Sequence, residues 1–129
     1  MIQIRRNVFE TNSSSTHSIT MCMKSDYDLW TKGTVWFIDR YDAKFLPWND
    51  LIEYITKTQY VDIDDIEAIK HDYADGYIER VEDMLADYDI FTYSSWLDKK
   101  HPDLERFTDQ FTTPNGETIM SFGYYGDEY

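Results

Sequence analysis

An apolar repeat at steps of three and four runs through residues 62–89 and limits the chain to folds that bury one face of a long helical segment. The repeat consists of Ile63, Ile66, Ile69, Tyr73, Tyr77, Val81, Met84, Leu85 and Tyr88. Either Asp62 or Asp64 is in position to cap the start of the helix. Gly76 falls inside the repeat, where glycine costs on the order of 1 kcal/mol relative to alanine. The pattern therefore predicts one long helix, with Gly76 as the point where it would break into two.

The same segment is the most acidic part of the chain, because its eleven carboxylates are opposed only by Lys70 and Arg80, leaving a net charge of −9. On a continuous helix, carboxylates at steps of seven, three, four and three form one stripe. The stripe consists of Asp65, Asp72, Asp75, Glu79 and Glu82, widened by Asp83 and Asp87. It is either the solvated face of the helix or a surface that fits a basic groove, since its spacing approaches that of backbone phosphates. As candidate partner-binding residues we take Asp65, Asp72, Asp75, Glu79, Glu82 and Asp83.

The composition of the whole chain excludes several classes of protein. A net charge of −13 over 129 residues would repel phosphate, so we expect no direct binding of nucleic acid, although residues 1–24 carry a net charge of +2. An aromatic content of 17% excludes a disordered acidic tail. A lone Cys22 excludes a disulfide framework and a four-cysteine zinc site. The sequence shows neither a membrane span nor a signal peptide, so we expect a cytoplasmic protein that does not bind a membrane.

Shorter patterns surround the acidic segment with strands and two further helices. Alternating or continuous apolar residues predict strands over residues 2–8, 17–23, 34–38, 90–93 and 120–124. One further helix is predicted after Pro47, with Leu51, Ile52 and Ile55 on one face. The other is predicted after Pro102, with Leu104, Phe107 and Phe111 on one face. Together they predict a single α+β domain over residues 1–129, with about five mostly antiparallel strands and about three helices, one long and acidic.

A serine-rich segment without apolar residues, residues 11–16, predicts the loop between the first two strands. Its motif residues, whose role the sequence leaves open, are Glu10, Thr11, Asn12, Ser13, Ser14, Ser15 and His17. The first interpretation is a structural loop, because Asn, Ser and Thr side chains close turns on their own backbone. The second is a phosphate cradle of hydroxyl and N–H groups, with Arg5 or Arg6 supplying charge. The third is a catalytic set in which His17 deprotonates Ser15 and Glu10 orients the imidazole.

The candidates for a metal site are His17, Cys22 and His71. Zinc accepts nitrogen and sulfur ligands, but the chain has no C-x-x-C or H-x-x-x-H pair. Each candidate also has a simpler interpretation: Cys22 is typical of a buried strand residue, and His71 of a solvated partner of Asp72. The sequence therefore predicts no cofactor, with zinc as the alternative.

The stretch from Arg5 to Ile19 resembles an N-terminal signature of bacteriophage and prophage proteins, a basic strand followed by V-F-E-T-N-S-S-S-T-H-S, here Val8 to Ser18. The resemblance implies a phage origin, and with it the cytoplasm of an infected bacterium, but it implies no reaction. In size and charge the chain is similar to small acidic anti-CRISPR and anti-restriction proteins.

These features lead to the hypothesis of an acidic inhibitor without enzymatic activity. It would bind a basic nucleic-acid-binding surface of a host defence protein, such as a CRISPR effector nuclease, by mimicking nucleic acid. The alternative is a small enzyme or a nucleotide- or phosphate-binding protein that uses the loop from Glu10 to Ser18. A third hypothesis is a minor virion or assembly component. The sequence is equally compatible with a monomer and a dimer.

Overall fold

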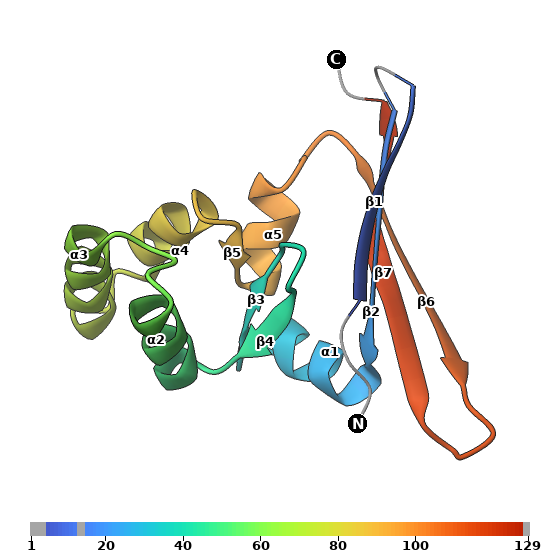
Figure 1. Ribbon diagram of the computed structural model, residues 1–129, viewed down its shortest axis with the longest axis horizontal. Helices are drawn as coiled ribbons and strands as arrows, with labels where there is room; N and C mark the ends of the chain where they lie inside the picture. The colour runs from blue at the N-terminus through green and yellow to red at the C-terminus, as the bar shows by residue number, and fades with distance from the viewer. Residues whose placement is uncertain (1–4, 13–14, 128–129) are drawn as a thin grey trace.

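The structure, a computed structural model, describes residues 5–12 and 15–127 (Figure 1). The described residues form seven strands and five helices, which confirms the α+β class but exceeds the predicted number of both kinds of element. The strands are β1 (Arg5–Asn12), β2 (Ser15–Met23), β3 (Trp36–Ile38), β4 (Lys44–Leu46), β5 (Ile90–Phe91), β6 (Glu105–Thr112) and β7 (Thr118–Asp127). The helices are α1 (Lys24–Thr31), α2 (Trp48–Lys57), α3 (Ile63–Ala74), α4 (Ile78–Ala86) and α5 (Tyr93–Lys99).

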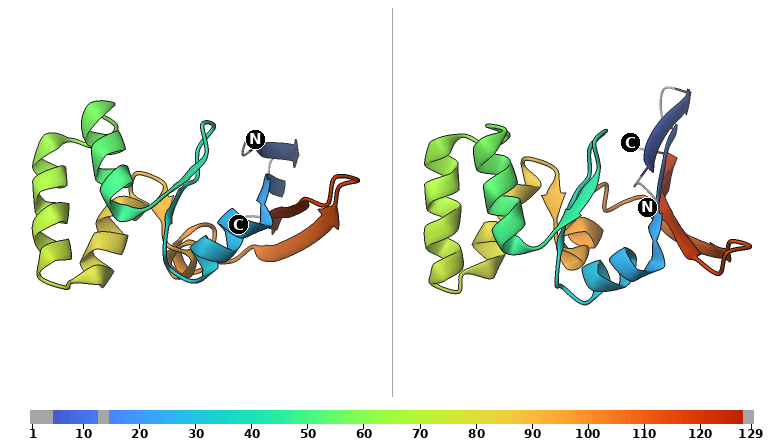
Figure 2. Two further views of the ribbon diagram at one scale, coloured as in Figure 1. Left: turned by 90° about the horizontal axis from the view of Figure 1, so that it is seen from below. Right: turned by 60° about the horizontal axis from the view of Figure 1, so that its bottom comes forward.

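Two antiparallel sheets organise these elements. A four-stranded sheet has the order β1-β2-β7-β6, and a three-stranded sheet has the order β4-β3-β5. The smaller sheet lies between the four-stranded sheet and the helices α2, α3 and α4, so the molecule is elongated with helices at one end (Figures 1 and 2). Among the described residues, no helix has the length and apolar character that crossing a membrane requires.

The small sheet separates two hydrophobic clusters, and the side chains of β3 alternate between them. Phe37 belongs to the cluster on the side of the four-stranded sheet. Trp36 and Ile38 belong to the cluster on the side of the helices, which includes Leu51, Ile55, Ile66, Ile69, Val81 and Leu85. Because both faces of β3 are covered, all three of its residues are buried, which explains why this segment reads as a continuous apolar run.

Trp30 of α1 is the centre of the first cluster and is fully buried. Its ring centroid lies 5.1 Å from that of Phe37, 5.1 Å from that of Phe122 and 5.3 Å from that of Trp96. Its indole Nε1–H donates to the carbonyl oxygen of Phe91 at 3.1 Å, so the polar atom of this side chain is satisfied inside the core. The residue thereby joins the first helix, the small sheet and the four-stranded sheet.

Part of the serine-rich segment that was predicted as a loop, residues 11–16, belongs to the four-stranded sheet. The strands β1 and β2 pair up to Asn12 opposite Ser15. The predicted six-residue loop over residues 11–16 is therefore wrong, because only residues 13 and 14 lie between the two strands, and these two fall outside the described residues. Backbone pairing needs no apolar side chain, which is why composition misplaced this boundary. In β7, a Cβ atom added at Gly123 would lie 1.8 Å from the carbonyl oxygen of Ser18, so this position of the sheet requires glycine.

The helical predictions hold in the centre of the chain and fail after it. The predicted long helix is broken at Gly76 into α3 and α4, with φ of +83° at this residue. The helix predicted after Pro102 is wrong, because residues 105–112 form β6. Phe107 and Phe111 are four residues apart, a spacing that fits one face of either a helix or a strand. The strand predicted over residues 90–93 ends at Phe91, because Thr92 caps α5 by accepting a hydrogen bond from the Ser95 N–H.

We expect Phe37→Ala to lower the free energy of unfolding by about 3–5 kcal/mol, because it leaves a cavity in the cluster around Trp30. Urea denaturation followed by tryptophan fluorescence measures the change. Tyr41→Ala is the matched control, since Tyr41 follows the same strand but is 95% exposed, and we expect a change within about 0.5 kcal/mol. Equal losses from both variants would contradict the role of β3 as a wall between two clusters.

Candidate functional site

The acidic segment folds as a helix hairpin, which we call the acidic hairpin and define as residues 62–88. The Tyr88 hydroxyl, just after α4, donates to the Asp65 carboxylate in the first turn of α3, so the two outer ends of the hairpin meet. The hairpin lies at the end of the molecule opposite the four-stranded sheet (Figure 1). Its apolar residues Ile66, Ile69, Val81 and Leu85 are buried against α2 and the small sheet, which leaves its polar side toward solvent.

The break at Gly76 divides the predicted stripe of carboxylates between two helices, so the prediction of one continuous stripe is wrong. Asp65 and Asp72 lie on α3 and Asp75 is its C-cap, whereas Glu79, Glu82 and Asp83 lie on α4. Three of the six are partly buried and bound: Asp65 by Tyr88, Asp72 by Arg80 at 4.0 Å, and Glu82 by the Thr92 hydroxyl. The other three, Asp75, Glu79 and Asp83, are exposed.

Most of the exposed negative charge of the hairpin is not neutralised within the described part of the chain. The side chains of Asp64, Glu67, Glu79 and Asp87 are exposed and make no hydrogen bond or ion pair with another described residue. Asp83 pairs with Lys99 at 2.5 Å, and Asp75 lies 3.4 Å from Nδ1 of His71. Ion pairs this exposed contribute little energy. The hairpin therefore presents an open, negatively charged surface.

A hollow between α4 and α5 brings three of the candidate residues together. Its volume is about 330 Å³, and it is lined by Glu79, Glu82, Asp83, Ser94, Ser95, Asp98 and Lys99. Four carboxylates and one ammonium group give it a negative lining. Even so, no group of three or more His, Cys, Asp or Glu side chains within residues 5–12 and 15–127 is arranged to hold a metal ion. The hollow is thus part of the acidic surface.

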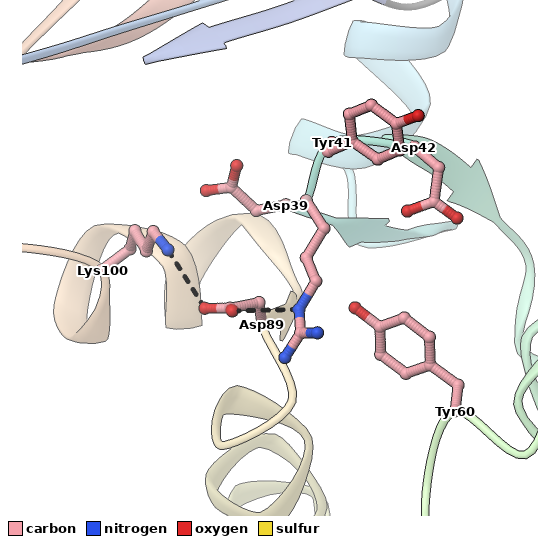
Figure 3. A pocket seen from close by; sticks show the side chains of 7 residues that line it. Asp39, Tyr41, Asp42, Tyr60, Asp89 and Lys100 are labelled. Carbon is pink, nitrogen blue, oxygen red and sulfur yellow. Dashed lines mark hydrogen bonds and ion pairs between the residues drawn. The ribbon is translucent and has the colours of Figure 1, made fainter. Parts of the chain in front are cut away.

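A second pocket, which the sequence did not indicate, lies at the base of the acidic hairpin (Figure 3). Its volume is about 510 Å³, and it is lined by Asp39, Arg40, Tyr41, Asp42, Tyr60, Asp89 and Lys100. The antiparallel pairing of Ile38 with Ile90 places Asp39, which follows β3, beside Asp89, which precedes β5. The Asp39 N–H donates to the Asp89 carbonyl oxygen at 2.8 Å, and Asp89 has a φ of +59°, a conformation that non-glycine residues rarely adopt. Strained residues of this kind concentrate at functional sites.

The side chains in this pocket form a series of polar and cation–π contacts from the end of α5 to the segment before α3. The Asp89 carboxylate accepts from Lys100 Nζ at 3.0 Å and from Arg40 Nε at 3.3 Å. The Arg40 guanidinium carbon lies 5.0 Å from the centroid of the Tyr60 ring. Burial raises the pKa of Tyr60 to about 12, and its hydroxyl has no hydrogen-bond partner in the described part of the chain. Only tertiary packing joins these residues, so no sequence pattern could reveal the pocket as a whole. The one sequence signal was for Asp39, which directly follows the apolar run of β3.

The serine-rich motif lies at the far end of the β1–β2 hairpin. Glu10, Thr11 and Asn12 end β1 and Ser15 begins β2, while Ser13 and Ser14 fall outside the described residues. The imidazole of His17 packs against the rings of Phe107 and Tyr125, with centroids 5.8 and 6.3 Å away. The side chains of Glu10 and Ser15 also lie outside what the structure describes, so the phosphate cradle and the catalytic set stay predictions.

The three metal candidates are not brought together. Cys22 is buried in the aromatic cluster, His71 is exposed on α3 in the acidic hairpin, and His17 is on β2 against aromatic rings. Burial raises the pKa of the Cys22 thiol to about 12. A thiol that stays protonated is a poor metal ligand and a poor nucleophile.

Comparison with protein-family models, with curated proteins and with solved structures found no match. The fold itself provides two surfaces that bear on function. These are the acidic hairpin and the pocket at its base, which share the junctions where the chain enters α3 and leaves α4.

We expect the Cys22 thiol to be unreactive toward Ellman's reagent in the native protein at mildly alkaline pH, because burial suppresses the thiolate. In concentrated guanidinium chloride it should release one equivalent of the coloured product. Thr31→Cys, at the exposed end of α1, is the matched control and should react in the native state. Rapid native reaction of Cys22 itself would show that the aromatic cluster is open to solvent.

Proposed function

We propose that this protein is a phage-encoded inhibitor without enzymatic activity that binds a basic nucleic-acid-binding surface of a host defence protein. The observation that carries the proposal is the set of exposed, unpaired carboxylates on the acidic hairpin: Asp64, Glu67, Glu79 and Asp87. In this proposal the hairpin takes the place of nucleic acid, and the partner's Lys and Arg side chains pair with carboxylates instead of phosphates.

The electrostatics of the chain favour such a partner over others. Residues 62–89 carry a net charge of −9, so a basic groove attracts this end of the molecule first and orients the encounter. The same negative charge would repel an acidic protein or a nucleic acid. CRISPR effector nucleases hold nucleic acid in positively charged channels and are one class that fits in the cytoplasm of an infected bacterium.

Exposed aromatic and aliphatic side chains beside the carboxylates supply candidate anchors for the interface. Tyr73, Tyr77 and Ile78 lie around Gly76 at the tip of the hairpin and are 37%, 49% and 41% exposed. Tyr73 stacks on Trp48 with ring centroids 3.7 Å apart and an interplanar angle of 9°, so its orientation is fixed before binding. A rigid aromatic side chain next to charged groups is typical of a binding hot spot.

The test is affinity capture from a bacterial lysate on immobilised protein, followed by release with duplex DNA at constant ionic strength. We expect nucleic-acid-binding proteins to be captured and then displaced by the DNA, because both ligands compete for one surface. We expect the variant Asp64→Asn/Glu67→Gln/Glu79→Gln to weaken capture about tenfold, since exposed ion pairs contribute roughly 0.2–1 kcal/mol each.

The matched control is Asp103→Asn/Asp109→Asn/Glu117→Gln, which changes the net charge equally with exposed residues away from the acidic hairpin. This control should retain the partner. If it loses the partner as fully as the hairpin variant, or if DNA releases nothing, the proposed mimicry is wrong. The conclusion applies only to variants whose thermal unfolding matches that of the parent protein.

A further inference from the structure

The pocket at the base of the acidic hairpin has fixed acidic and aromatic walls. The Trp96 Nε1–H donates to Asp39 at 3.1 Å, and the Tyr54 hydroxyl donates to Asp42 at 2.7 Å. Lys100 holds Asp89 at 3.0 Å with a side chain that is only 15% exposed. Each carboxylate is thus oriented by a donor, which is buried or partly buried for Asp39 and Asp89 and lies at the surface for Asp42. Such walls need little reorganisation to receive a ligand.

Arg40 is the loosely held part of the same pocket. Its side chain is 49% exposed and makes one ion pair, from Nε to Asp89 at 3.3 Å. A bidentate arginine–carboxylate pair would use two parallel bonds of about 2.7–2.9 Å. The two terminal nitrogens of Arg40 have no hydrogen bond to another described residue, and its guanidinium carbon lies 5.0 Å from the centroid of the Tyr60 ring. Arg40 is therefore held in the pocket only weakly, so another cation can displace its side chain.

We infer that this pocket receives an arginine side chain of the basic partner, and that Arg40 occupies the same place in the free protein. The inference rests on the proposed function, which supplies a partner rich in Arg and Lys. Without Arg40, the lining holds three carboxylates and one ammonium group, which leaves it negatively charged, so it favours a cationic ligand.

The shape and chemistry of the lining select guanidinium over ammonium. The Tyr60 ring offers a face on which a planar cation stacks, and Asp89 and Asp42 line the same pocket and supply acceptors (Figure 3). A guanidinium group combines stacking with several directed N–H bonds, whereas an ammonium group cannot stack. Tyr60 precedes α3 and Asp89 follows α4, so a partner seated on the acidic hairpin is brought beside the pocket.

The experiment is an NMR titration of the whole protein with N-acetylarginine amide, and with N-acetyllysine amide as the matched probe of equal charge. We expect Arg40→Ala to bind the arginine probe about tenfold more tightly than the parent protein. An internal competitor that fills a site nine-tenths of the time lowers the apparent affinity by about that factor. Arg40→Ala should also prefer the arginine probe to the lysine probe, and adding Asp89→Asn should remove most of the gain.

Arg40 is exposed, so its replacement is not expected to unfold the protein, and thermal unfolding checks this directly. Equal binding of the arginine probe to Arg40→Ala and to the parent protein would overturn the inference. Equal binding of both probes to Arg40→Ala would also overturn it, because only overall charge would then be at work. The hairpin variant Asp64→Asn/Glu67→Gln/Glu79→Gln should keep its affinity for the probe, which separates failure of the pocket from failure of the proposed function.

Discussion

The burial of β3 on both faces is the interaction on which the rest of the structure depends. Phe37 projects into the aromatic cluster around Trp30, and Ile38 projects into the aliphatic cluster beneath the helices. A strand of three residues can do this only because each neighbour buries a different side of it. The four-stranded sheet and the helices α2–α4 therefore meet through this small sheet, which the figures show between them (Figures 1 and 2).

The shortness of the central strands also explains why charged residues gather at the base of the acidic hairpin. The β3 strand ends at Ile38 and is followed directly by Asp39 and Arg40, and β5 begins at Ile90 directly after Asp89. Antiparallel pairing then brings these polar ends to one edge, next to two large hydrophobic clusters. Asp39 is only 2% exposed there, and the indole N–H of Trp96 supplies the hydrogen bond that such burial requires. The same packing that stabilises the core thus assembles the pocket.

The sequence predicted the elements whose apolar spacing has a single interpretation. Continuous apolar residues located β3, and the repeat after Ile63 located α3 and α4 together with their break at Gly76. The segment with Phe107 and Phe111 was predicted as a helix because its spacing suits two periods, and only pairing with β7 decides for a strand. The exposure of Asp75, Glu79 and Asp83 was within reach of the sequence. The partly buried positions of Asp65, Asp72 and Glu82 were not, because they depend on Tyr88, Arg80 and Thr92 from other turns of the fold.

The pairing of β2 with β7 has a consequence for how the chain reaches this structure. The register joins Ser15 with Asp127 and Met23 with Ile119, so every helix of the described chain is synthesised between the two partners. On the ribosome, the helices and the small sheet emerge while β2 still lacks its central neighbour. Contacts this distant along the chain slow folding, because the intervening loop must close before they form. The helical end therefore has the opportunity to condense first, and the four-stranded sheet is completed last.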